Sequence, residues 1–63
     1  MKYEINARFE KEGPDGKVVI RITWETEVDN MEMAAGKAAA YIRISEREEG
    51  AACVYMNVEA IDA

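Results

Sequence analysis

Two alternating segments joined by a tight turn constrain this chain more than any other feature of its sequence. Apolar and polar residues alternate over residues 2–10 and again over 18–25. A period of two describes a strand with one buried and one solvated face. Between the segments, Pro14 presets the φ of a turn's second residue and Gly16 accepts the positive φ that follows. The sequence therefore predicts a β-hairpin. Its expected inward residues are Tyr3, Ile5, Ala7 and Phe9, then Val18, Ile20, Ile22 and Trp24.

A helix is expected after the hairpin. Asp29 followed by Glu32 is typical of a capping box at a helix N-terminus. The helix is expected over residues 31–47, and Gly50 is typical of the left-handed residue that ends a helix. Glycine costs about 1 kcal/mol relative to alanine in a helix interior, so Gly36 among alanines favours a close approach of the helix to the sheet. The expected buried stripe is Met31, Ala34, Ala35, Ala38, Tyr41 or Ile42, and Ser45.

The last segment, residues 51–60, alternates again. This segment is the expected third strand. It is expected to lie beside the first strand, because a right-handed crossover leaves room there for the helix. The sequence therefore predicts a single α+β domain over residues 1–63. The expected fold is a β-β-α-β two-layer sandwich, with an antiparallel three-stranded sheet of order 2-1-3 and one helix on one face. On the third strand Val54, Met56 and Val58 are expected to face the helix, and Cys53, Tyr55, Asn57 and Glu59 to face away.

Composition argues against several classes of function. Eight Lys and Arg against thirteen Asp and Glu leave 8 − 13 = −5, with no histidine and one cysteine. An acidic chain is poorly suited to binding nucleic acid directly, since that affinity comes from neutralising phosphates. Without histidine, the usual zinc ligand sets cannot be assembled. We therefore expect no metal, no cofactor and no direct contact with nucleic acid.

Catalysis is also not expected. A chain this short has little room for a cleft, Ser45 has no predicted base beside it, and Cys53 on a strand is typical of a packing residue. No segment approaches the roughly 20 apolar residues of a membrane span, and the N-terminus has no apolar run of signal-peptide length. These observations favour a non-enzymatic, cytoplasmic protein.

One helix covers only one face of a three-stranded sheet, so the second face is expected to be open. Two interpretations of that face stay open: an ordinary solvated surface, or a contact surface that Val19, Cys53 and Tyr55 mark. The two outer strands are edges that another chain can pair with, so a homodimer is a further possibility. The residues expected on the open face are Lys2, Glu4, Asn6, Arg8, Val19, Arg21, Thr23, Cys53, Tyr55 and Asn57.

Two features of the helix also suggest contact with a partner. Glu46, Glu48 and Glu49 lie in the last turn, where the helix dipole disfavours anions. This cluster is either an exposed helix end or a surface for a basic partner. Met33 and Ile44 share a strip on the outer side of the helix, and such strips are adaptable contact surfaces when they are exposed. The alternative is that the buried stripe is broad and that Ile44 packs against a loop.

The sequence thus predicts a non-enzymatic protein-binding module, an inhibitor or adaptor that docks on a basic surface of a larger protein, such as one that binds nucleic acid. In size, acidity and α+β class it resembles small phage-encoded inhibitors such as anti-CRISPR proteins, although no residue motif carries the likeness. The alternative is a structural homo-oligomer assembled through edge strands and the open face. The predicted contact residues are Glu46, Glu48, Glu49, Met33, Ile44, Tyr55 and Val19.

Overall fold

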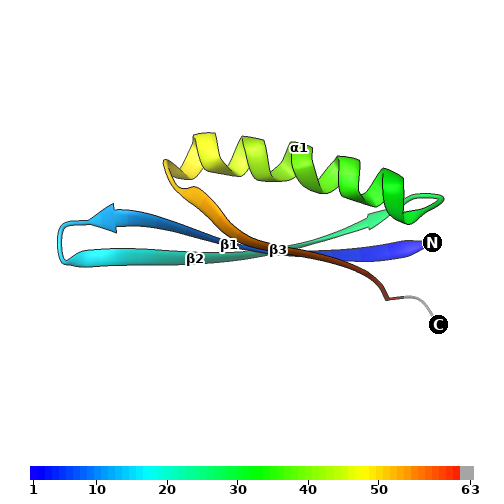
Figure 1. Cartoon of the computed structure of the whole chain (residues 1–63), viewed down its shortest axis with the longest axis horizontal. Helices are drawn as coiled ribbons and strands as arrows, with labels where there is room; N and C mark the ends of the chain where they lie inside the picture. The colour runs from blue at the N-terminus through cyan, green and yellow to red at the C-terminus, as the bar shows by residue number, and fades with distance from the viewer. Residues whose placement is uncertain (62–63) are drawn as a thin grey trace.

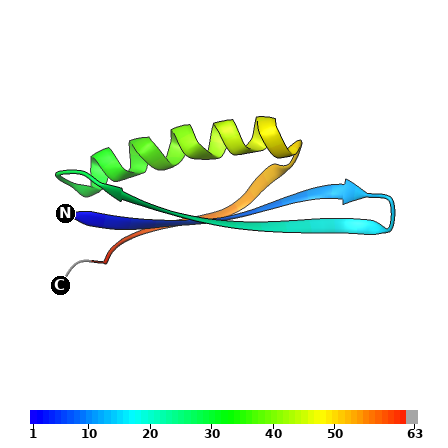
Figure 2. The same ribbon diagram turned by 180° about the vertical axis from the view of Figure 1, so that it is seen from behind.

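Three strands and one helix follow one another in the predicted order. The hairpin consists of β1 (Lys2–Gly13) and β2 (Gly16–Glu27), and α1 (Met31–Glu49) and β3 (Ala52–Ala60) follow it. β1 lies between β2 and β3 and is antiparallel to both. The helix lies on one face of the sheet (Figures 1 and 2). The computed structural model, which describes residues 1–61, thus confirms the α+β fold and the strand order.

The turn forms as predicted and carries the hairpin beyond the helix. Pro14 and Asp15 connect the strands, and Gly16 has a φ of 117°. The molecule is elongated, 42 × 20 × 13 Å, with the hairpin tip extending past the C-terminal end of α1 (Figure 1). Val18 is therefore 38% exposed. Its partner across the hairpin is Lys11, whose long side chain does reach the end of the helix and donates to the backbone oxygen of Glu49. The expectation that Val18 is buried is wrong because the helix stops short of the tip.

The core lies between β1 and α1. Ile5 and Phe9 are fully buried, and Tyr3 is 3% exposed. Ala34 and Ala38 are their counterparts on the helix, both fully buried. Because alanine is small, the helix backbone comes close to the sheet and shields side chains of β1 from water. The prediction of the buried face of β1 is confirmed at each of its four residues: Tyr3, Ile5, Ala7 and Phe9.

β2 is less well covered than β1. Ile20, Ile22 and Trp24 point to the helix side as predicted but are only half-buried. The reason is the position of α1, which contacts β3 and β1 more than β2. The Trp24 ring packs against that of Tyr41, with 5.4 Å between the ring centroids. Aromatic contact thus closes part of the gap on this side.

The helix starts at Met31 as expected, but its N-cap is not the residue that the capping box implies. Its N-cap is Asn30, whose Oδ1 accepts the N–H of Met33 at 2.9 Å, and Asp29 lies outside. Asn and Asp are both good N-cap residues, so the sequence pattern did not distinguish Asn30 from Asp29, and the prediction of Asp29 as the cap is wrong. At the other end the helix continues to Glu49, and Gly50 has a φ of 62° as expected.

The buried stripe of α1 is narrower than predicted. Ala34, Ala38 and Ser45 are buried, whereas Met31 is 45% exposed and Ala35 is exposed. Successive residues lie about 100° apart around a helix, so Ala35 turns away from the line of contact through Ala34. The predictions for Met31 and Ala35 are wrong, because one helix on a narrow sheet buries little more than that line.

Gly36 does not mark a close approach. It is exposed, and a Cβ built at this position would meet nothing within 4 Å. The alanines on the buried side make the close approach instead, so this prediction is wrong.

A β-bulge reverses the expected facing of the first part of β3. Arg8 pairs with Tyr55 while Phe9 pairs with Cys53, which leaves Val54 as an extra residue. Cys53 therefore lies on the helix side and packs against the cluster around Phe9, and the prediction that it faces away is wrong. Val54, predicted to face the helix, is 47% exposed and lines a hollow with Glu10.

Beyond the bulge the predicted facing of β3 returns. Val58 packs against the cluster of Tyr3, Val28 and Ala34. Met56 lies opposite Ala7, on the helix side, but is 44% exposed. Its predicted facing is thus confirmed, and it stays partly exposed because it lies on an edge strand that the narrow contact line leaves partly uncovered.

The two glycines of the helix region predict opposite responses to alanine. Gly36→Ala is expected to stabilise the fold by about 1 kcal/mol, because it adds helix propensity in open space. The melting temperature, measured by circular dichroism, should rise by about 4–8 °C. Gly50→Ala is the matched control, since its positive φ costs alanine about 1–2 kcal/mol, and its melting temperature should fall. A lower melting temperature for Gly36→Ala would contradict the open placement of this residue.

Candidate functional site

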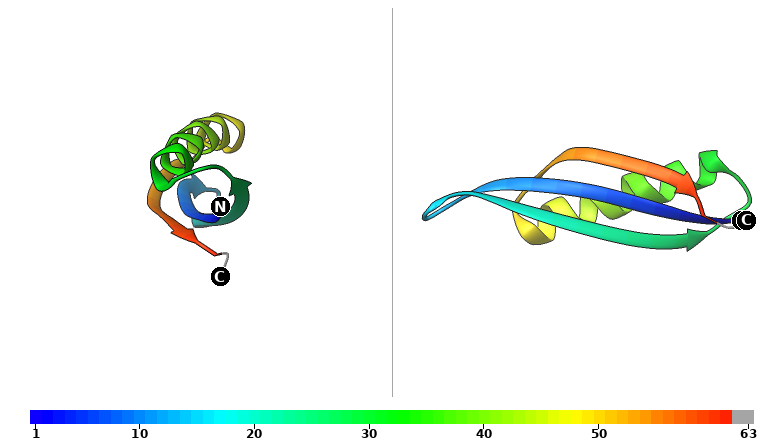
Figure 3. Two further views of the ribbon diagram at one scale, coloured as in Figure 1. Left: turned by 90° about the vertical axis from the view of Figure 1, so that its right-hand side faces the viewer. Right: turned by 90° about the horizontal axis from the view of Figure 1, so that it is seen from below.

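The face of the sheet turned away from α1, called the open face here, carries its charges in separate rows. Residues paired across antiparallel strands point to the same side of a sheet, and the register therefore aligns three rows from β2 through β1 to β3. Figure 3 shows this face, with α1 behind the strands in its right-hand view. The carboxylate row is Glu25, Glu4 and Glu59; the amide row is Thr23, Asn6 and Asn57; the arginine row is Arg21, Arg8 and Tyr55.

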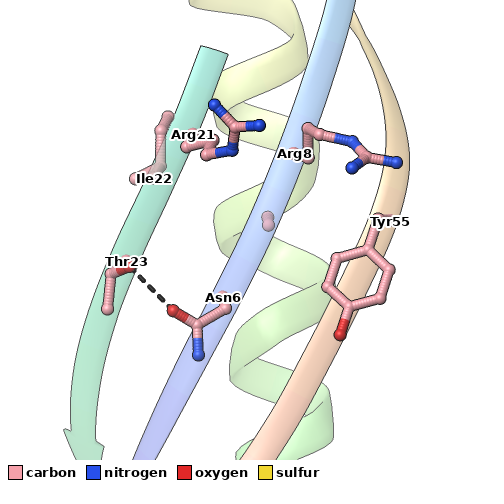
Figure 4. Close-up of a pocket in the computed structure, with 7 residues that line it drawn as sticks. Asn6, Arg8, Arg21, Ile22, Thr23 and Tyr55 are labelled. Carbon is pink, nitrogen blue, oxygen red and sulfur yellow. Dashed lines mark hydrogen bonds between the residues drawn. The ribbon is translucent and has the colours of Figure 1, made fainter. Parts of the chain in front are cut away.

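The arginine row pairs two residues of like charge across the hairpin. Arg8 and Arg21 are direct partners across the hairpin, and both are exposed. The guanidinium carbon of Arg8 lies 5.8 Å from the centroid of the Tyr55 ring, and Arg21 reaches from β2 towards β1 (Figure 4). Within residues 1–61 the one ion pair is Lys17–Glu10, at 3.3 Å. Neither arginine of this row therefore has a carboxylate partner there, and their proximity costs free energy.

Hydrogen bonds order two residues of the amide row, Thr23 and Asn6, and join Asn6 to Glu4. Thr23 Oγ1 donates to Asn6 Oδ1 at 2.8 Å (Figure 4). Asn6 Nδ2 donates to Glu4 Oε1 at 2.9 Å. These bonds fix the orientation of the Asn6 side chain and connect the carboxylate row to the amide row. The centre of the open face is thus an ordered polar surface.

A shallow hollow of about 180 Å³ lies between the arginine and amide rows. It is smaller than the roughly 300–1,000 Å³ of sites that enclose a drug-sized molecule. Arginine donates in a fixed fork that suits carboxylates, and asparagine and threonine offer both donors and acceptors. The hollow therefore fits individual side chains of another protein. Its lining includes Asn6, Arg8, Arg21, Thr23 and Tyr55.

Glu46 has an internal role that the sequence does not reveal. Its Oε2 accepts the backbone N–H of Cys53 at 2.9 Å, beside the bulge in β3, and the side chain is half-buried. This bond ties the last turn of α1 to the start of β3. It accounts for an acidic residue at this end of the helix without reference to a partner.

The rest of the acidic cluster is exposed but partly compensated. Glu48 and Glu49 are both exposed. Lys11 Nζ donates to the backbone oxygen of Glu49 at 2.9 Å, which places a cation where the helix dipole favours one. A partner role for the cluster stays a prediction.

The remaining predicted contact residues are exposed on two opposite sides of the molecule. Met33 and Ile44 are 46% and 54% exposed on the helix, which confirms that the buried stripe does not reach them. Val19 and Tyr55 are 42% and 52% exposed, and Tyr55 lies in the arginine row. The structure therefore does not bring the helix strip and the sheet residues together.

The pairing of Arg8 with Arg21 is the feature that the sequence reasoning missed, although a signal for it exists. The turn sets the register of the hairpin, because Gly13 pairs with Gly16. Counting five residues back from Gly13 and five residues forward from Gly16 leads to the pair Arg8 and Arg21. No such signal predicts that Tyr55 of β3 joins this row, since the register of β3 depends on the bulge.

Comparison with known proteins adds no assignment: no family model, no curated protein and no solved structure matches this chain. Within residues 1–61 no group of three or more potential ligand side chains is placed to hold a metal ion. No helix of that part has both the length and the apolar character to cross a membrane.

The internal role of Glu46 predicts an unequal effect of two neighbouring substitutions. Glu46→Ala leaves the Cys53 N–H without its acceptor, so the free energy of unfolding should fall by about 1–2 kcal/mol. Glu48→Ala, at an exposed position, should change it by no more than about 0.5 kcal/mol. Urea unfolding followed by circular dichroism measures both. Glu46→Gln keeps an acceptor and should retain part of the stability; equal stability of all variants would contradict the role.

Proposed function

We propose that this chain is a non-enzymatic protein-binding module and that the open face is its contact surface. The arginine row is the observation that carries the proposal. Two exposed arginines pair across the hairpin without a carboxylate partner in residues 1–61, and the Arg8 guanidinium lies over the half-exposed Tyr55 ring. Local rules that are broken without internal compensation tend to occur at functional sites.

The composition of this row supports contact with protein. Arginine and tyrosine are enriched among the residues that dominate binding energy at protein interfaces. Val19 extends the row's surface towards the hairpin tip on the same face, and hydrogen bonds order the side chains of Thr23, Asn6 and Glu4 beside it. A side chain ordered before binding loses less entropy on binding. A carboxylate from a partner would relieve the repulsion between the two arginines.

The finer prediction is an inhibitor or adaptor that docks on a basic surface of a larger protein. The carboxylate row supplies the acidic groups of the open face that such docking would use. The alternative, a structural homo-oligomer, would use the open face as well. Both proposals therefore depend first on whether the open face is the contact surface.

Co-purification with variants of each surface tests the proposal. Tagged wild-type protein and three double variants are incubated with a lysate of the source organism, and retained proteins are quantified by mass spectrometry. Arg8→Ser with Tyr55→Ser should lose the partner, since truncating such residues costs about 2 kcal/mol or more. Met33→Ser with Ile44→Ser, on the helix, and Glu48→Lys with Glu49→Lys, at its end, should retain it.

Unchanged melting temperatures for all three variants control for unfolding. If the open-face variant still retained the partner while either helix variant lost it, the open face would not be the contact surface, and α1 would carry that role.

A further inference from the structure

The outward side chains of β1 follow an ordered sequence of charges. From Lys2 to Glu10 they are Lys2, Glu4, Asn6, Arg8 and Glu10, so the charges run positive, negative, neutral, positive, negative. Reversing the strand about Asn6 puts Glu10 in the place of Lys2 and Arg8 in the place of Glu4. Each of these charges then meets its opposite. Glu12 follows nearer the hairpin tip, where the reversed strand has no residue to meet it. A surface complementary to its own reversed copy is what a two-fold interface between identical chains requires.

The neighbouring strands repeat this relation. On β2, Glu25 and Arg21 lie at equal steps on either side of the amide row. On β3, Glu59 and Tyr55 do the same, and a phenolic hydroxyl can donate to a carboxylate. The carboxylate row and the arginine row therefore exchange places across all three strands when the face is turned about the amide row.

We propose that the open face binds a second copy of this chain, sheet against sheet, about a two-fold axis that runs along the amide row. The inference rests on the proposed function, which makes the open face the contact surface, and it names the partner. In the dimer each arginine row lies against the carboxylate row of the other copy. The amide row lies against itself, and Asn6 offers both a donor and an acceptor for that contact.

Other symmetric arrangements match the charges less well. A two-fold axis parallel to the strands would place carboxylate row on carboxylate row, which like-charge repulsion opposes. Pairing between β3 edges is hindered at the start of the strand, because Glu46 already accepts the N–H of Cys53. The face-to-face arrangement about the amide row requires neither contact between carboxylate rows nor pairing of β3 edges.

The dimensions of packed sheets allow these contacts. Adjacent rows are two residues apart, about 7 Å along the strand, and stacked sheets lie about 10 Å apart. Aligned sheets are rotated by about 30° relative to each other. This rotation moves a row that lies about 7 Å from the axis sideways by about 4 Å. The long side chains of Arg8 and Glu4 span such a shift. At the rim, Val19 would meet Glu27, and the charges do not match there.

The interface is small and depends on charge. Three strands about 4.8 Å apart make a narrow face, so the buried area is at the low end for protein interfaces. Its attraction comes from exposed ion pairs, which salt weakens. The dimer is therefore expected at low ionic strength and high protein concentration, and salt should dissociate it.

A charge exchange between Arg8 and Glu4 tests the proposal. Sedimentation velocity in low salt should show a concentration-dependent dimer for the wild type. Arg8→Glu and Glu4→Arg each place like charges across the axis twice, so each should weaken the dimer about tenfold or more. The chain carrying both substitutions, and an equimolar mixture of the two single variants, should dimerise again. Native mass spectrometry identifies the heterodimer of the mixture by its mass.

The same exchange on β2, between Arg21 and Glu25, is the second test if a variant of β1 fails to fold, as judged by circular dichroism. A wild type that stays monomeric at millimolar concentration in low salt would overturn the inference. So would a dimer that the single variants leave intact, or one that the mixture fails to restore. Loss of co-purification by the open-face variant would then still support a heterologous partner, so the two proposals fail separately.

Discussion

The burial of β1 beneath α1 is the interaction on which the rest of the structure depends. Ile5 and Phe9 are fully buried because Ala34 and Ala38 let the helix lie close to the central strand. The apolar contact is a narrow line, and no second layer covers the other face within residues 1–61. Exposure of the open face, and partial exposure of β2, follow directly from this arrangement.

The bulge in β3 links the core to the candidate site. Cys53 and Val58 are an odd number of residues apart, so a regular strand would point them to opposite faces. The extra residue, Val54, lets both pack on the helix side. It also sets Tyr55 opposite Arg8 on the open face. The bond from Cys53 to Glu46 secures this irregular start of the strand.

The charges of the open face have a different origin from those of the helix end. At the end of α1, Glu46 and Lys11 satisfy backbone groups, so local structure explains much of that acidic cluster. On the open face, Arg8 and Arg21 are adjacent without such an explanation in residues 1–61. A net charge of −5 therefore describes this surface poorly, because its positive and negative groups are separated into rows. Such separation favours recognition of a surface with the same spacing.

Local patterns in the sequence determined the hairpin, its turn, the helix and the buried face of β1, because alternation, turn residues and helix ends report backbone geometry over a few residues. The turn at Pro14 and Asp15 also determined the β1–β2 register. Tertiary structure decided which cap begins α1, that Gly36 faces solvent and that Cys53 turns inward. It also decided the rows of the open face, because the pairing of β1 with β3 joins segments distant in the chain. That register depends on how side chains pack beneath the helix, which no local pattern records.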